Sequence, residues 1–139
     1  MARRIAALLR HGDYHQLPAT PSAHQPFPLT EAGEQQASEA AAVLADDLHE
    51  HGWHLHSVID SSCLLRGWQT ARLAGEQLTR LTDAVCEVES FPELAERSVG
   101  SAANLTVAEI ESIVEADPRY PPLPPDWKSD SHFCLPLQG

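Results

Sequence analysis

The interpretation of this chain starts from the stretch Leu8-Leu9-Arg10-His11-Gly12. Its two leucines end an apolar run, residues 5–9, that is typical of a short buried strand. Gly12, three residues after this run, allows a sharp turn of the backbone. An arginine and a histidine are therefore expected at the end of a strand. A guanidinium offers planar paired donors to phosphate oxygens, and a neutral imidazole nitrogen can attack phosphorus. The pattern predicts phosphoryl transfer through His11, and a purely structural histidine at the strand end is the alternative.

The composition predicts one globular domain over residues 1–139, because 42% hydrophobic residues are enough for a core of ordinary size. Asp and Glu number 20 against 9 Lys and Arg, which gives a formal net charge of -11. Nucleic acid and anionic membranes are therefore not expected as partners. No apolar segment has the length of a signal peptide core or a membrane span. The 3 cysteines follow no metal-ligand pattern, which is typical of a reduced, cytoplasmic protein.

Strands and helices are expected to alternate along the chain after a long proline-containing loop at residues 13–28. Helix caps are predicted at Thr30, Gly52 and Thr106, and Ser61-Ser62 is predicted as a turn. The expected elements are strands at 5–9, 57–60 and 84–88, and helices from Thr30 to Gly52, across Leu65–Leu78, and from Thr106 to Ala116. This alternation predicts an α/β fold with a parallel sheet covered on both faces.

The last stretch, residues 118–139, is expected to be an irregular tail outside the core, because it is rich in proline and has no periodic apolar pattern. Three strands make a thin sheet for the apolar helix faces. We therefore expect the domain to be incomplete at its C-terminus.

Basic residues follow two of the expected strands. Arg10 and His11 come after the first strand, and Arg66 comes one helical turn after the second. Ligands of open parallel sheets bind at the carboxyl ends of the strands, so these side chains are expected to meet around a phosphoryl group. A surface arginine paired with a carboxylate is the alternative for Arg66.

Four histidines between residues 49 and 56 are the main candidates for a metal site. They lie on both sides of the expected helix end at Gly52, and no carboxylate or cysteine is expected to complete an ordered ligand set. No metal site is therefore predicted.

Three blocks of sequence resemble the histidine phosphatase superfamily, also called phosphoglycerate mutase-like. They are Leu9–Gly12, Pro28–Ala37 and Ser62–Ala71, and the resemblance covers residues 4–105. It implies a three-layer α/β/α sandwich with a mostly parallel sheet. It also implies a metal-independent phosphatase without a cofactor, acting on a phosphorylated small molecule or a phosphoprotein.

The resemblance assigns roles to particular residues. His11 would form a phosphohistidine intermediate, and Arg10 and Arg66 would hold the phosphate. The stretch Leu94–Gly100 is similar to a further family motif, so Glu96 is expected to be the general acid and Glu93 its reserve.

Two departures from the family pattern bear on function. The loop after Gly12 lacks the Trp-Asn pair and the downstream arginine of mutase-like members, which favours a phosphatase over a mutase-like phosphotransferase. The family's second pocket histidine has no counterpart after Glu96, since His132 lies in the tail with no strand before it. A non-catalytic phosphate-binding fragment therefore remains a further alternative, and the chain is expected to be the N-terminal part of a longer protein.

Overall fold

The computed structural model describes residues 3–21 and 24–136 of the chain. The described residues form two compact units. The first holds the residues up to His15 together with Pro26–Ala95, and the second holds Gln16–Gln25 and the residues from Glu96 onward.

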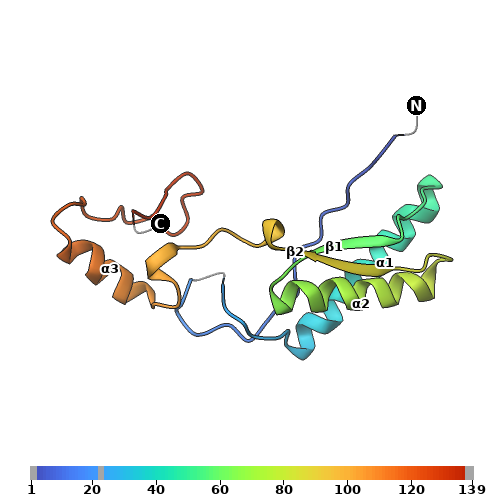
Figure 1. Ribbon diagram of the computed structural model, residues 1–139, viewed down its shortest axis with the longest axis horizontal. Coiled ribbons are helices and arrows are strands. Elements are labelled where there is room, and N and C mark those ends of the chain that lie inside the picture. Colours follow the sequence, from blue (N-terminus) through green and yellow to red (C-terminus); the bar gives the residue numbers. More distant parts are fainter. Residues whose placement is uncertain (1–2, 22–23, 137–139) are drawn as a thin grey trace. The chain divides into compact units, whose positions relative to one another are not determined.

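Two helices and two parallel strands build the first unit (Figure 1). They are α1 (Glu31–His51), β1 (Val58–Ser62), α2 (Leu65–Leu81) and β2 (Glu87–Phe91). The strands pair in parallel, with Val58 opposite Glu87 and Ser62 opposite Phe91. Helix α2 packs on both strands and also on α1. Helices and parallel strands thus alternate along this unit, which confirms the predicted α/β class.

Helix α1 begins and ends where the sequence predicts. The Thr30 side chain caps its N-terminus by accepting a hydrogen bond of 3.1 Å from the Gly33 backbone N–H. At the other end Gly52 adopts a left-handed conformation with φ 63°, which a glycine takes without strain. The small residues Ala41 and Ala45 of α1 are buried against Ala74 and Leu78 of α2, so the two helices pack through short side chains.

The apolar run at residues 5–9 does not form a strand, so this prediction is wrong. Its side chains lie in solvent, with Leu8 97% exposed and Ile5 53% exposed, and in Figure 1 the segment runs away from the sheet. A strand that is apolar at every position needs hydrogen-bonding neighbours and cover on both faces. Among the described residues the sheet consists of β1 and β2. Ile59 of β1 and Cys86, which directly precedes β2, already pack against the core formed by α1 and α2.

The two observed strands are shifted relative to the prediction. Strand β1 includes Ser61 and Ser62, which were expected to form a turn, and β2 starts three positions later than the predicted 84–88. Pairing explains both shifts, because the Ser61 hydroxyl lies 3.0 Å from that of Ser90 across the two strands. Val85 is outside the sheet and 72% exposed.

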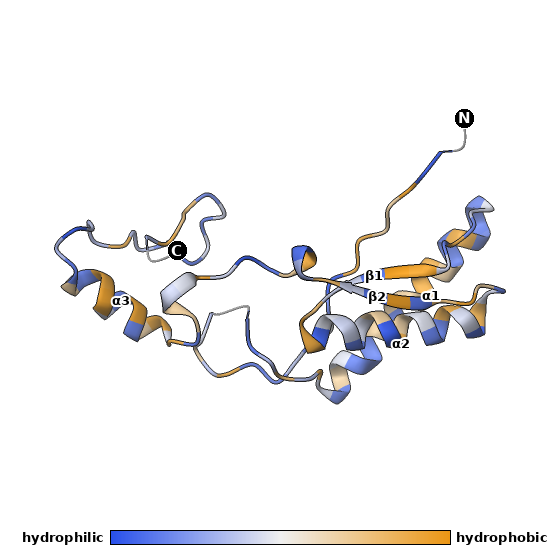
Figure 2. Ribbon diagram, viewed as in Figure 1, coloured by the Kyte–Doolittle hydropathy of each residue, from blue (hydrophilic) through white to orange (hydrophobic). Residues whose placement is uncertain are grey.

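The second unit is built around α3 (Val107–Ala116). Its N-terminus has the predicted capping box, in which Thr106 and Glu109 satisfy each other's backbone N–H groups. Most of α3 is apolar in Figure 2, and Ile110 is fully buried. The short 3-10 helix η2 (Gly100–Ala102) adds the buried Ala102.

The tail supplies half of this second core, so the expectation that it lies outside the core is wrong. Trp127 and Leu135 are 8% and 4% exposed and pack with Ala102 and Ile110. The indole N–H of Trp127 also donates a hydrogen bond of 3.1 Å to Glu111 on α3. A large aromatic residue can anchor an irregular segment without any periodic pattern, because one side chain buries enough apolar surface. Within the described residues, every helix is too short or too polar to cross a bilayer.

Candidate active site

The Arg-His-Gly turn lies directly against the start of α1. A Cβ atom added to Gly12 would overlap the Gly33 carbonyl, and one added to Gly33 would overlap the Asp13 carbonyl. The Thr30 N–H donates a hydrogen bond of 3.0 Å to the same Asp13 carbonyl. Glycine is therefore required at both positions by a close backbone crossing, which fixes the chain next to His11.

The same turn is tied to α2 through one hydroxyl group. The Gly12 N–H donates to Thr70 Oγ1 at 3.1 Å, and that hydroxyl donates to the Arg66 carbonyl at 2.7 Å. Thr70 is 3% exposed, so water does not compete for these bonds. The backbone beside His11 is thereby held at a defined position relative to the first turn of α2, which carries Arg66.

The imidazole of His11 is oriented by its own neighbour. Its Nδ1 lies 2.8 Å from the Gly12 carbonyl oxygen. A carbonyl accepts and never donates, so Nδ1 carries the proton in this bond. In the neutral ring Nε2 then holds the lone pair, which is the form that a nucleophile needs.

The ring of Tyr14 contacts both His11 and Arg66. Its ring centroid lies 5.5 Å from that of His11, with the two planes at 85°. The Arg66 Cζ atom lies 4.3 Å from the centroid of the same ring. Arg66 is 1% exposed, so the alternative of a surface arginine is wrong. Sequence reasoning missed Tyr14, whose only signal was an aromatic residue three positions after the histidine.

The other predicted residues are placed differently. Arg10 is exposed in the extended segment before Gly12, and within the described chain its guanidinium makes no hydrogen bond or ion pair. Glu96 belongs to the second unit, where it is exposed and its backbone carbonyl contacts the ring of His24. Glu93 is exposed in η1 (Pro92–Leu94), which follows β2 and contacts β1.

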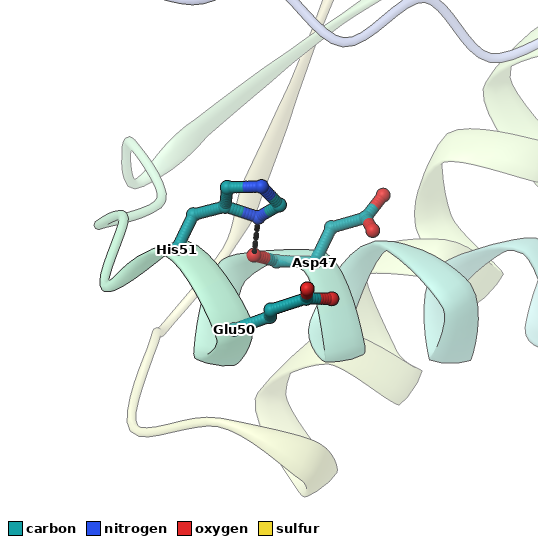
Figure 3. Close-up of side chains that lie close together, drawn as sticks. All are labelled: Asp47, Glu50 and His51. Atoms are coloured by element: carbon teal, nitrogen blue, oxygen red, sulfur yellow. Dashed lines mark hydrogen bonds between the residues drawn. The ribbon is translucent and has the colours of Figure 1, made fainter.

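A possible metal-ligand group lies elsewhere, on the last turns of α1 (Figure 3). Asp47, Glu50 and His51 are exposed, and one ligand atom from each lies within 4.8 Å of the others. Two carboxylates therefore lie close to His51, one of the four histidines, and the absence of a metal site stays a prediction. Its Nδ1 lies 2.9 Å from the Asp47 backbone oxygen, and its ring stacks on Trp53 at 4.3 Å. Acidic groups on an exposed helix end commonly lie this close without a metal, so the group by itself assigns no function.

Comparison with known proteins identifies the family. The model of the histidine phosphatase superfamily (branch 1) matches residues 6–132. A solved mycobacterial glucosyl-3-phosphoglycerate phosphatase is 26% identical, with a TM-score of 0.59 over 76% of this chain and 44% of that one. Its complex with inorganic phosphate is 28% identical, with a TM-score of 0.52 over 76% and 42%. A structure described as mycobacterial hydrolase 2 is 25% identical, with a TM-score of 0.58 over 76% and 40%.

No curated protein matches the chain. The chain spans 40 to 44% of the length of these solved structures, and its fold is the phosphoglycerate mutase-like α/β fold. The family model covers the Arg-His-Gly turn, α1, β1, α2, β2 and α3 in one match. The chain belongs to the histidine phosphatase superfamily.

Proposed function

We propose that this chain is part of a phosphatase that hydrolyses a phosphomonoester through a phosphohistidine on His11. The observation that supports it most is the placement of His11 and the buried Arg66 against one ring, that of Tyr14. An oriented imidazole beside a guanidinium suits attack on a phosphoryl group whose charge is neutralised at the same time. Membership in the family, and the phosphatase among the structures that it resembles, support hydrolysis as the reaction.

The first half of the reaction transfers the phosphoryl group to the protein. Nε2 of His11 forms a bond to phosphorus while the ester P–O bond breaks. Arg66 and Arg10 bind the non-bridging oxygens, and Glu96 gives its proton to the leaving oxygen. Glu96 takes this role because of its family-like stretch, with Glu93 as the reserve.

The second half returns the protein to its starting state. Water attacks phosphorus, the N–P bond breaks, and the Glu96 carboxylate takes the proton that water loses. Inorganic phosphate leaves and His11 is neutral again. Every bond change is carried by side chains and water, so the scheme requires no metal ion and no cofactor.

Charge supports a small anionic substrate. The chain carries a formal net charge of -11, so the buried guanidinium of Arg66 is an unusual positive charge in an acidic protein. A phosphate group suits a buried arginine, because a guanidinium offers planar paired donors to phosphate oxygens. The substrate is proposed to be a phosphorylated small molecule or a phosphoprotein, and nucleic acid is not proposed.

The cellular setting and the extent of the domain are also proposals. Cys63, Cys86 and Cys134 are all free thiols, which fits a reducing compartment, so we place the protein in the cytoplasm. The family match runs from residue 6 to residue 132 and so includes parts of both units. We therefore treat residues 1–139 as one histidine phosphatase-type domain.

A second candidate is a chain that binds phosphate without turning it over. One observation favours it, the exposure of the segment 5–9 and of Arg10. A mutase-like phosphotransferase is the remaining alternative from the sequence.

One assay separates these candidates. The chain is mixed with 4-nitrophenyl phosphate, and the reaction is quenched rapidly at neutral to alkaline pH. The mass of the intact protein is then measured by mass spectrometry. A phosphatase releases 4-nitrophenol and gains one acid-labile phosphoryl group, and both signals disappear in His11→Ala. His132→Ala is the matched control and should keep both. Binding of phosphate without adduct or turnover would identify the binding chain, and interconversion of 2- and 3-phosphoglycerate would identify the mutase.

A further inference from the structure

We infer that Tyr14 is a positioning residue that holds the Arg66 guanidinium beside His11 before phosphate binds. The inference rests on the proposed function, since it gives Arg66 a phosphate to bind. The chain has 2 tyrosines, and each lies against an arginine. Arg119 Cζ is 5.2 Å from the ring centroid of Tyr120, and Arg66 Cζ is 4.3 Å from that of Tyr14. Of these two arginines, Arg66 is buried.

The backbone of Tyr14 is fixed from two directions. It forms an antiparallel bridge with Leu29, and the His15 N–H donates a hydrogen bond of 3.0 Å to the Pro28 carbonyl. Leu29 is 4% exposed, and its N–H donates to Gln69 Oε1 on α2 at 2.8 Å. The base of the Tyr14 side chain is therefore held at a set distance from the helix that carries Arg66.

The ring then limits where the guanidinium can lie. An arginine side chain has many rotamers, and ordering it at the moment of binding costs conformational entropy. A ring face that attracts the cation lowers this cost by ordering the side chain in advance. The contact also preserves the positive charge of the guanidinium, which attracts the phosphate oxygens.

The same ring contacts the nucleophile. The nearly perpendicular arrangement of the Tyr14 and His11 rings is a favourable aromatic geometry. His11 is also held through its Nδ1–H and through the Gly12 backbone. Tyr14 therefore sets the distance between the attacking nitrogen and the cation that receives the phosphate oxygens, without itself contacting the reacting atoms.

The test compares Tyr14→Leu, Tyr14→Phe and Tyr120→Leu in the full chain. Inorganic phosphate is the probe, and its dissociation constant is measured by calorimetry. Tyr14→Leu should weaken binding about thirtyfold, the size of a desolvated cation–π contact. Tyr14→Phe keeps the ring and should rescue binding to within about twofold. Tyr120→Leu removes the matched exposed contact and should leave phosphate binding unchanged.

A second readout does not depend on function. A ring face shifts the NMR signals of the Arg66 side chain upfield, and these signals are assigned with Arg66→Lys. The shift should be present in the wild type and Tyr14→Phe and lost in Tyr14→Leu. If Tyr14→Leu does not fold, NOEs from the Tyr14 ring to the Arg66 methylenes in the wild type test the contact instead. The absence of these NOEs would overturn the inference.

The outcomes separate the two proposals. If phosphohistidine forms but Tyr14→Leu binds phosphate as the wild type does, Tyr14 has no positioning role and the proposed function stands. If no phosphohistidine forms, the proposed function fails. The NMR shift of Arg66 then tests the contact with Tyr14 independently. A shift lost in Tyr14→Leu alone supports the contact, and a shift that is the same in the wild type, Tyr14→Phe and Tyr14→Leu overturns it.

Discussion

The hydroxyl of Thr70 connects the Arg-His-Gly turn to α2, so Thr70→Val should loosen the site and the fold together. Valine keeps the shape and removes both hydrogen bonds. The buried Gly12 N–H loses its acceptor, which costs about 1–3 kcal/mol. The Arg66 carbonyl keeps its helical hydrogen bond and loses only the extra one, about 0.5–1 kcal/mol. The free energy of unfolding should therefore fall by about 1.5–4 kcal/mol, which corresponds to about 10 °C in melting temperature.

Thr70→Ser is the matched control, because it keeps the hydroxyl and removes one buried methyl group. It should cost only about 1 kcal/mol. Urea unfolding followed by far-UV circular dichroism gives both free energies, and the phosphohistidine assay gives the effect on the site. We expect adduct formation to slow in Thr70→Val and to survive in Thr70→Ser. A serine variant as unstable as the valine variant would show that the hydroxyl does not bridge the two segments.

Three further predictions concern the rest of the chain. Gly33→Ala should lower the free energy of unfolding by about 2–4 kcal/mol in urea, because its Cβ would overlap the Asp13 carbonyl. Trp127→Ala should cost about 3–5 kcal/mol and reduce the hydrogen-exchange protection of the α3 amides, and unchanged protection would refute the second core. A hydrogen bond from the Arg119 side chain lowers the pKa of Asp117 to about 2 from 3.8. The stabilisation from this hydrogen bond is fully present above 3.8, the pKa of Asp117 in the unfolded chain, and is lost as the pH falls through about 2. Asp117→Asn should therefore lower the melting temperature at neutral pH and leave it unchanged below a pH of about 2.

The helices were predictable because their determinants are local. Thr30, Gly52 and the Thr106–Glu109 capping box each act within a few residues, and all three mark helix ends in the structure. The strands were less predictable, because a strand is defined by its partner. β2 was misplaced by three positions, and the apolar run at 5–9 was assigned to a sheet that it does not join.

For the candidate site, the sequence supplied the chemical groups and the family. The motif blocks around His11, Thr30 and Arg66 indicated the histidine phosphatase superfamily, and the family match confirms it. The roles of Arg10 and Glu96 remain proposals, whereas His11 and Arg66 both contact the ring of Tyr14.

Tertiary structure decided how those groups are arranged. It buried Arg66 under the Tyr14 ring, crossed Gly12 over Gly33, and drew Trp127 from a proline-rich tail into a core. These features join residues far apart in the chain, whose proximity depends on how whole elements pack. A residue's type and its near neighbours set its chemistry and its local conformation, whereas its burial and its partners arise only when the chain has folded.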